Sequence, residues 1–191
     1  LTATGKLYTW GSAARNELGV YLERVQDMCT PIPVGEQALR DVAMVQASAG
    51  DAHNAAVDSQ GAVWVWGVNL DGQLGLGDCL GQKTPYKLAN EQVFEGQLIK
   101  AVACGFQHTL ALSEQGVVWV WGKGLFGKLG TDTTRSCHSP CKIDASVFEH
   151  EKVQVVAGGY QHSACITESR CVYTWGGGVW KEFQANGTVR E

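Results

Sequence analysis

Residues 116–122, Gly-Val-Val-Trp-Val-Trp-Gly, decide the fold, because similar segments recur along the chain at regular intervals. The step aromatic-x-Trp-Gly occurs four times, and its tryptophans are Trp10, Trp66, Trp121 and Trp175. Successive tryptophans of this set lie 56, 55 and 54 residues apart. Self-similarity at a fixed period of this length is typical of a solenoid, a propeller or an array of repeats. The feature to be explained is therefore the repeat and not any single residue.

Two further motifs keep the same spacing. Gly-x-x-His occurs three times, and Gly-x-Leu-Gly follows the tryptophan segment at residues 72–75 and 127–130. The second motif weakens to Asn16-Glu-Leu-Gly19 in the first unit and does not recur after Gly176. Because they recur with the period, we expect the following residues to be structural: Gly50, His53, Trp66, Gly67, Gly105, His108, Trp121, Gly122, Gly159, His162, Trp175 and Gly176.

One unit reads as four short strands. Residues 98–104 and 108–112 are β-rich runs separated by a glycine-containing break, and residues 117–121 form a third run after a polar turn that ends in glycine. Residues 139–143 make a fourth extended segment, which contains Pro140. Since proline cannot donate to a strand ladder, this last segment should be a sheet edge. Four strands per unit without helical periodicity is typical of a propeller blade.

The composition narrows the class of protein. Apolar residues make up 45% of the 191 residues and charged residues 18%, which favours one globular domain. The net charge of −4 provides no basic surface for nucleic acid. No apolar run approaches the roughly 20 residues that a membrane helix needs, so membrane insertion is not expected.

The cysteines indicate in which cellular compartment the protein is found. The chain has seven, an odd number, at positions 29, 79, 104, 137, 141, 165 and 171. Cys104 and Cys165 lie in strand-like runs, where a buried free thiol behaves as a small apolar side chain. Free thiols persist in reducing compartments, so the sequence predicts a cytoplasmic or nuclear protein.

Together the three motifs resemble the repeat of the regulator of chromosome condensation (RCC1) family. Gly105-Phe-Gln-His-Thr109, residues 116–122 and Gly72-Gln-Leu-Gly75 are similar to its Gly-x-x-His-Thr step, its tryptophan strand and its Gly-Gln-Leu-Gly loop. The resemblance covers about residues 5–176. It implies an all-β fold of four-stranded antiparallel RCC1-like β-propeller blades, in a family whose members are seven-bladed.

The chain is then a partial seven-bladed propeller of about three and a half blades. We divide the RCC1-like repeats, residues 1–176, into units near 5–60, 61–115 and 116–169 and a partial unit at 170–176. The divergent C-terminal tail is 177–191. Neighbouring blades supply each other's core. We therefore expect the chain to be part of a larger protein, with the remaining blades supplied by the parent chain or by another chain.

No residue is predicted to be catalytic. His53, His108 and His162 occupy the same place in successive units, so hydrogen bonds to backbone between blades explain them better than convergence on a metal. Cys137-His-Ser-Pro-Cys141 supplies two thiols and an imidazole, but zinc needs four ligands and only His150 is a further candidate nearby. The chain also lacks a phosphate-binding loop and a nucleophile elbow. We expect no enzyme activity of these residues, no metal and no cofactor. The family resemblance leaves a further alternative, in which the blades are an accessory domain of a larger enzyme such as a ubiquitin ligase.

The predicted function is a non-catalytic protein-interaction module, because rigid scaffolds commonly present binding residues on their loops. The candidate binding residues are Asp51, the loop residues Gln73 and Lys128, and Trp180, which lies outside the repeat pattern. The family resemblance implies an alternative, guanine-nucleotide exchange on a Ran-like small GTPase. In the founding member an acidic residue at the position of Asp51 contributes to nucleotide release. The other interpretation of Asp51 is that it is a turn residue whose side chain forms a hydrogen bond with its own backbone.

One branch of the family senses ultraviolet light through tryptophans in Gly-Trp-Arg-His-Thr motifs. The matching positions here are 51–52, 106–107 and 160–161, and they hold no tryptophan. The resemblance therefore does not imply light sensing for this chain.

Overall fold

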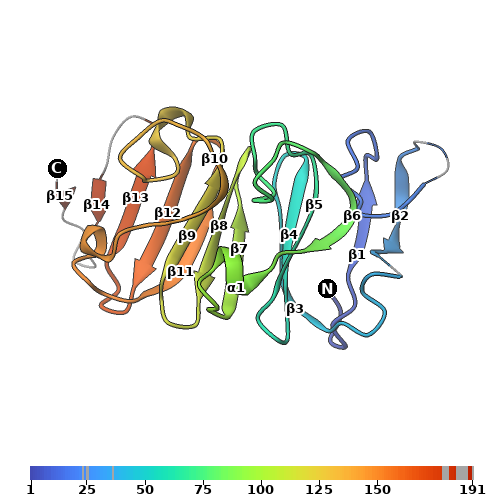
Figure 1. Cartoon of the computed structure of the whole chain (residues 1–191), viewed down its shortest axis with the longest axis horizontal. Helices are drawn as coiled ribbons and strands as arrows, with labels where there is room; N and C mark the ends of the chain where they lie inside the picture. The colour runs from blue at the N-terminus through green and yellow to red at the C-terminus, as the bar shows by residue number, and fades with distance from the viewer. Residues whose placement is uncertain (23, 25, 36, 178–180, 184–188, 191) are drawn as a thin grey trace.

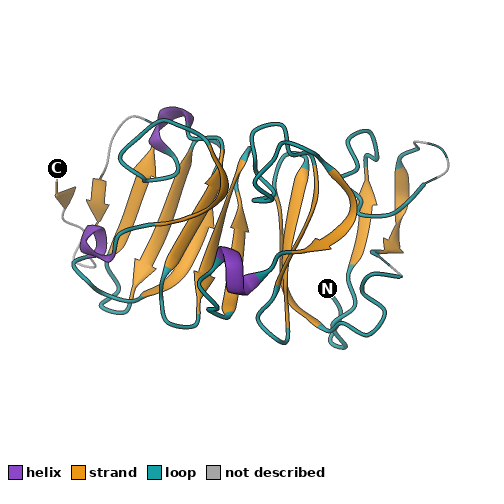
Figure 2. Cartoon of the chain, viewed as in Figure 1, coloured by secondary structure: helices purple, strands orange, loops and turns teal. Residues whose placement is uncertain are grey.

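Four antiparallel β-sheets follow one another along the molecule, from the N-terminal sheet at one end to the C-terminal sheet at the other (Figure 1). The computed structural model describes the chain except residues 23, 25, 36, 178–180, 184–188 and 191. Strands and loops make up almost all of the described chain, with a few short helical turns between them (Figure 2). The expected all-β fold of antiparallel blades is confirmed.

The bounds of the elements are as follows. The first sheet holds β1 (Tyr8–Gly11) and β2 (Met28–Pro33); the second holds β3 (Met44–Ala49), β4 (His53–Asp58), β5 (Val63–Gly67) and β6 (Gln82–Lys87). The third holds β7 (Ile99–Cys104), β8 (His108–Ser113), β9 (Val118–Gly122) and β10 (Cys137–Lys142). The last holds β11 (Val153–Gly158), β12 (His162–Thr167), β13 (Val172–Gly176), β14 (Lys181–Phe183) and β15 (Val189–Arg190). The helical turns are α1 (Asn90–Val93), η1 (Leu125–Gly127) and η2 (Ala145–Phe148).

Within each complete sheet, strands pair in chain order, β3-β4-β5-β6 and β7-β8-β9-β10. The first strands of these two sheets are joined directly. The side-chain amide of Gln46 on β3 bonds the backbone N–H and the backbone C=O of Val102 on β7, at 3.0 and 2.9 Å. The first strands therefore lie where the sheets meet, and the last strands lie at the outside.

The outer strands are true sheet edges and carry prolines. Pro140 lies in β10, Pro85 in β6 and Pro31 in β2. Each of these strands stands at the edge of its sheet. An edge strand tolerates a residue that cannot donate to the ladder. The edge position predicted for the segment around Pro140 is confirmed.

Apolar side chains fill the space between neighbouring sheets. Trp119 and Trp121 on β9 both contact Phe94, which follows α1, with ring centroids 5.7 and 5.9 Å apart. Residues two apart in a strand share one face, so both indoles enter the same core. Phe148 at the end of η2 lies in the same way against the aromatic pair of β13. Each core is thus built by two successive units.

The sheets are out of phase with the sequence units. The third sheet runs from Ile99 to Lys142, so it takes β7 and β8 from the unit before Gly116 and β9 and β10 from the unit that begins there. Among the described residues, the first sheet consequently consists of β1 and β2, the two strands that follow Gly5. None of the helices in the described part of the chain has the length and apolar character needed to cross a membrane.

Candidate interaction surface

Two kinds of turn lie at the same end of the sheets. The Gly-x-x-His turn joins the first two strands of a sheet, and a long loop follows the tryptophan strand. They are neighbours because His108 at the start of β8 lies opposite Gly122 at the end of β9. The backbone N–H of Lys123 also bonds the Gln107 carbonyl at 2.9 Å. We call this region the loop end; it is at the top of Figure 1 and comprises the turns 50–53, 105–108 and 159–162 and the loops 68–81 and 123–136.

The recurring histidines join neighbouring units at the loop end. Thr109 Oγ1 lies 2.9 Å from His53 Nε2 and donates its single proton to the Gln73 carbonyl oxygen at 2.8 Å. His53 Nε2 must therefore carry a proton and donate it to the hydroxyl. The sequence predicts hydrogen bonds from the imidazole to backbone between blades. In the structure the Thr109 hydroxyl lies between the His53 imidazole and the Gln73 carbonyl, and the backbone of His108 also bonds the imidazole.

The same arrangement recurs one unit later. Ser163 Oγ lies 2.9 Å from His108 Nε2 and donates to the Lys128 carbonyl oxygen at 2.8 Å. The indole N–H of Trp121 donates to the Gln73 carbonyl oxygen at 2.8 Å. A single loop carbonyl thus accepts hydrogen bonds from two side chains of the following unit. These bonds fasten each long loop to the sheet that comes next.

Burial keeps the two imidazoles neutral. It lowers the pKa of His53 to about 4, against a backbone hydrogen bond to His108 that acts to raise it. Burial, and then the positive charge of Lys128, lower the pKa of His108 to about 3. A general acid or base works best when its pKa lies near the operating pH. Their chemistry here is hydrogen bonding, not proton transfer, whereas His162 in the last sheet is exposed.

Each Gly-x-x-His turn requires glycine at its first position for a steric reason. A Cβ atom placed on Gly105 would collide with the His108 ring and lie 2.6 Å from the Gly159 carbonyl oxygen. On Gly50 it would lie 2.5 Å from both the His53 ring and the Gly105 carbonyl oxygen. The imidazole lies directly over the glycine Cα, so no other residue fits there without displacing it.

The predicted binding residues lie in different environments. Asp51 is exposed, and its Oδ2 lies 3.1 Å from Arg15 Nη1. Gln73 and Lys128 are buried, and their backbone carbonyls accept the bonds described above. Trp180 lies outside the described residues. Of the three that the structure describes, only Asp51 offers its side chain to solvent.

Lys128 places an ammonium group inside the loop end. The residue has no exposed surface, and its Nζ donates to Gln161 Oε1 at 3.0 Å. Burial, and then the charge of Lys123, lower the pKa of Lys128, while Asp71 opposes them. Asp71 Oδ1 itself lies 3.5 Å from Lys123 Nζ. The buried charge is therefore held by a neutral amide, while the nearby carboxylate pairs with the more exposed lysine.

Sequence reasoning missed an aromatic pair at the loop end. Phe106 and Tyr160 occupy the position of Asp51 in the next two units, and their rings stack with centroids 4.1 Å apart. Tyr160 is nevertheless 61% exposed. The sequence does contain a signal for this pair. Both residues are aromatic and hold the same position in consecutive units, so they would be expected on adjacent blades.

The long loops carry further exposed apolar side chains. Leu70 precedes one Gly-x-Leu-Gly motif, and Leu125 and Phe126 precede the other; all three are exposed. Phe126 has a φ of 65°, a left-handed conformation that is uncommon for a bulky residue. In each loop the exposed apolar residues therefore lie just before a buried residue, Gln73 or Lys128, that the sequence analysis proposes as a binding residue.

The thiol and imidazole candidates form no metal centre among the described residues, which contain no group of three or more side chains suited to a metal ion. All seven cysteines are free. Burial, and then the neighbouring Cys141, raise the pKa of Cys137 to about 12. His138 faces away from this pair toward the exposed Cys79, with Cys79 Sγ 3.9 Å from both ring nitrogens.

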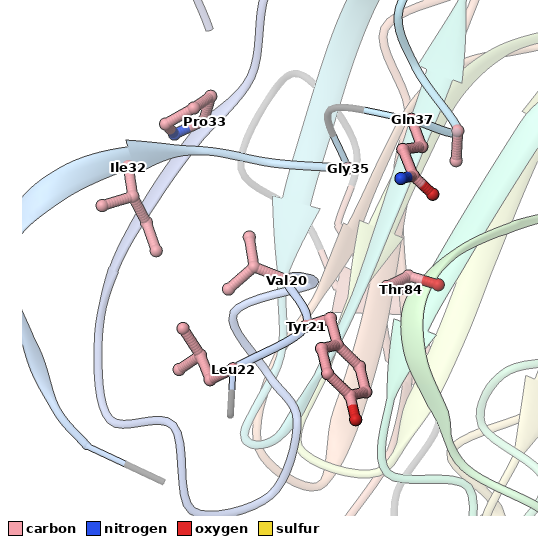
Figure 3. Close-up of a pocket in the computed structure, with 9 residues that line it drawn as sticks. Val20, Tyr21, Leu22, Ile32, Pro33, Gly35, Gln37 and Thr84 are labelled. Carbon is pink, nitrogen blue, oxygen red and sulfur yellow. The ribbon is translucent and has the colours of Figure 1, made fainter. Parts of the chain in front are cut away.

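A separate cleft of about 470 Å³ opens beside the first sheet (Figure 3). Val20, Leu22 and Ile32 line one side, and Gln37 and Thr84 line the other. No residue that lines it carries a charge at neutral pH. The cleft therefore provides apolar surface and a few hydroxyl and amide groups, without a pair of groups for acid–base chemistry.

Comparison with known proteins assigns the family. The description "Regulator of chromosome condensation (RCC1) repeat" matches residues 4–57, 60–112 and 115–166, which is more than half of the chain. A second description of the same repeat matches residues 44–73 and 99–128. The matches coincide with the repeat read from the tryptophan spacing.

Individual relatives cover most of this chain. The ultraviolet-B receptor UVR8 of Arabidopsis thaliana is 36% identical over 171 residues, which is 90% of this chain and 37% of that protein. The human E3 ubiquitin-protein ligase HERC2 is 36% identical over 180 residues, 93% of this chain and 4% of the ligase. The chain thus spans well under half the length of these relatives.

Solved structures share the architecture. Human WBSCR16 superposes with a TM-score of 0.80 at 26% identity, covering 92% of this chain and 44% of that chain. Prp20p from Saccharomyces cerevisiae superposes with a TM-score of 0.72 at 23% identity, covering 86% and 40%. These likenesses confirm the expected partial propeller of RCC1-like blades. By its repeats and by this architecture, the chain belongs to the regulator of chromosome condensation (RCC1) repeat family.

Proposed function

We propose that the chain is a non-catalytic module that binds a protein partner through the loop end. The observation that carries this proposal is the stacked pair of Phe106 and Tyr160, of which Tyr160 remains 61% exposed. Aromatic side chains are enriched at protein interfaces and supply much of the binding energy there. The stack also fixes both rings, which reduces the conformational entropy that binding would otherwise cost.

The neighbouring loop supports the same surface. Phe126 lies 34 residues before Tyr160, much as Arg15 lies 36 residues before Asp51, and Arg15 reaches Asp51 at 3.1 Å. The left-handed backbone at Phe126 keeps a large apolar ring in solvent, which costs free energy in the isolated chain. We define the loop-end patch as Phe106, Phe126 and Tyr160.

Affinity capture with single variants tests the proposal. The chain, immobilised through its C-terminus, is incubated with cell extract, and retained proteins are quantified by mass spectrometry. Tyr160→Ala and Phe106→Ala should lose the same retained protein. Tyr86→Ala is the matched control, because Tyr86 is 51% exposed on the outer strand β6, away from the loop end. Loss of retention with the Tyr86 variant alone, or with none, contradicts the proposal.

The alternative function is guanine-nucleotide exchange on a Ran-like small GTPase, with Asp51 as the acting carboxylate. It rests on family membership, and the structure of Prp20p is described with its binding properties to Gsp1p and histones. Asp51 is exposed at the loop end, and Arg15 partly neutralises it. Release of a fluorescent guanine nucleotide from the GTPase measures the activity directly. Asp51→Ala should abolish any acceleration and Arg15→Ala should preserve it; no acceleration by the unmodified chain excludes this function for the chain.

We also infer a reducing compartment, the cytoplasm or the nucleus. The support is that all seven cysteines are free, with Cys104 and Cys165 buried among apolar side chains. Burial raises the pKa of each of these two thiols to about 12, which disfavours the reactive thiolate. Alkylation of the protein under denaturing conditions as its source cells are lysed, followed by mass spectrometry, should find all seven thiols modified; a disulfide-linked pair would contradict the inference.

A further inference from the structure

Lys128 is a buried lysine at a position where the repeat does not require one. It has no exposed surface and lies in the motif Gly127-Lys-Leu-Gly130. In the preceding unit the same position is Gln73, whose backbone carbonyl oxygen accepts from Thr109. The backbone carbonyl oxygen of Lys128 accepts from Ser163 in the same way. The contact that joins the units therefore uses the backbone of this position and leaves its side chain open to another role.

The side chains at this position differ in what they contact. Gln73 Oε1 accepts from the backbone N–H of Asp71 at 2.9 Å, so the glutamine folds back on its own loop. Lys128 instead extends its ammonium group to Gln161 Oε1 at 3.0 Å, in the Gly-x-x-His turn of the last sheet. An ammonium group has three N–H donors, and a neutral amide oxygen does not balance its charge. A residue that departs from the local pattern without a gain to the fold is a candidate for a functional role.

The charges around Lys128 do not balance within the described part of the chain. Asp71, whose charge acts on Lys128, lies 3.5 Å from Lys123 Nζ. Asp132 is the only acidic residue of the loop 123–136, and it is exposed. The ion pairs of the described residues are Arg15–Asp51, Lys123–Asp71 and Lys142–Glu95. Two ammonium groups therefore share one carboxylate, and the buried ammonium is the one that it does not pair with.

This arrangement disfavours the isolated chain and favours a complex with an anion. A buried charge costs free energy unless an opposite charge and hydrogen bonds compensate for it. Burial lowers the pKa of Lys128 for the same reason. A carboxylate brought from outside the chain would supply the compensation that the described residues do not.

The ammonium group lies beside the loop-end patch. Its partner Gln161 directly follows Tyr160, and Phe126 precedes Lys128 by two residues in the same loop. Gln161 is only half-buried. A partner that contacts the ring of Tyr160 is therefore also close to the amide that holds Lys128.

We propose that the loop end recognises an acidic side chain, an aspartate or glutamate of the protein partner, and that Lys128 is the residue that binds it. The partner's carboxylate displaces Gln161 Oε1 from Nζ and accepts charge-assisted hydrogen bonds there. A carboxylate has nearly the size and shape of the amide that it displaces, so it fits this buried place. Apolar residues beside it contact the loop-end patch. The inference rests on the proposed function, because the acidic side chain belongs to the partner of that patch.

Selection of peptides on the immobilised chain tests the proposal. The probe is a library of random peptides displayed on phage, and selected peptides should combine an aspartate or glutamate with a neighbouring apolar residue. Fluorescence polarisation of a selected peptide then measures its affinity. Lys128→Gln installs the residue that the preceding unit carries, and it should weaken binding about tenfold or more. Lys142→Gln is the matched control, because Lys142 is an exposed lysine at the other end of β10, paired with Glu95, and its variant should bind the peptide unchanged.

A double-mutant cycle isolates the contact. Replacing the acidic residue of the peptide by its amide should weaken binding to the unmodified chain about tenfold, but should scarcely change binding to Lys128→Gln. Gln161→Ala removes the competing acceptor, so the acidic peptide should bind this variant more tightly. A purely structural role of the bond between Lys128 and Gln161 predicts weaker binding instead. Thermal unfolding checks that Lys128→Gln folds; if it does not, the peptide amide and Gln161→Ala still decide the outcome.

The outcomes separate this inference from the proposed function. Selection of neutral or basic peptides, or equal affinity of Lys128→Gln for the acidic peptide, overturns the acidic partner. A library that yields no binding peptide overturns it as well, because an acidic residue beside an apolar one is a feature of a short segment. If Tyr160→Ala still abolishes capture of a protein in those cases, the interaction module stands without the carboxylate. If acidic peptides bind through Lys128 but independently of Tyr160, the loop-end patch is the part that is wrong.

Discussion

His53 and Thr109 are 56 residues apart in the sequence and 2.9 Å apart in the structure. His108 and Ser163 repeat the relationship one unit later, 55 residues and 2.9 Å apart. Each bond spans one repeat, and the histidine Nε2 donates it, because the hydroxyl it meets has already given its proton to a loop carbonyl.

Acidification should destabilise the fold from about pH 6.5 downward. Burial lowers the pKa of His53 to about 4, while a histidine in the unfolded chain titrates near pH 6.5. Between these values the unfolded chain binds more protons, so stability rises with pH and its loss continues down to about pH 4. Each pH unit costs on the order of 1.4 kcal/mol per buried histidine. Urea titrations at a series of pH values measure the slope.

The variant His53→Gln separates this effect from that of the carboxylates. Glutamine can donate to Thr109 but does not titrate, so the slope of stability against pH should decrease in the variant. An unchanged slope would show that His53 is not the group responsible.

Gly105→Ala should cost about 3 kcal/mol of unfolding free energy, the upper end of what overpacking costs. The added Cβ collides with the His108 ring and with a backbone carbonyl, which cannot move without opening the turn. Gly96→Ala is the matched control, because Gly96 has a φ of 74° with nothing within 4 Å. Backbone strain alone should cost the control about 1–2 kcal/mol. Denaturant unfolding compares them, and an equal loss would argue against the steric account.

Lys128→Met should stabilise the protein by about 1 kcal/mol at neutral pH. Replacing a buried charge by an apolar side chain of similar volume is often neutral or stabilising, and the ammonium of Lys128 donates to a neutral amide, Gln161, instead of pairing with a carboxylate within the described part of the chain. Lys123→Met is the comparison, because Lys123 is more exposed and pairs with Asp71; its effect should be within about 1 kcal/mol of zero. Clear destabilisation by Lys128→Met would mean that the ammonium group has a stronger partner than Gln161.

Asp58→Ala should cost about 3 kcal/mol, because it removes the acceptor of several buried donors. The Asp58 carboxylate accepts from the backbone N–H groups of Gln60 and Ala62 and from Trp64 Nε1, each at 2.9 Å. Ser113 holds the same position one unit later and accepts from the N–H of Val117. Asp58→Ser should therefore recover part of the loss in thermal unfolding; equal losses for both variants would contradict this assignment.

The spacing of Trp-Gly steps was sufficient to predict the blades, because a fixed period with strand-like runs leaves few architectures. The hairpins and the outer edge at Pro140 followed from local chemistry. The phase of the sheets did not, because pairing of β8 with β9 crosses the glycine at which the sequence unit begins. Which strands share a sheet depends on contacts between different segments, so it cannot be predicted from any one segment alone.

The surface was harder to predict than the fold. Gln73 and Lys128 are polar residues in glycine-rich loops, which favours exposure, but each loop lies beneath side chains of the next unit. Their burial depends on residues such as Trp121, 48 positions away from Gln73. The aromatic pair of Phe106 and Tyr160 was visible at one repeat position, yet its stacking depends on the spacing of adjacent blades.

The bonds from histidine to hydroxyl to loop carbonyl connect each unit only to its immediate neighbours. Stability in such a chain is a sum of unit terms and nearest-neighbour couplings, as in a one-dimensional array. A central unit has a coupling on both sides, and a terminal one has a single coupling. Amide hydrogen exchange should therefore be slowest in β7–β9 and become faster toward both termini, so that the chain frays from its ends before it unfolds.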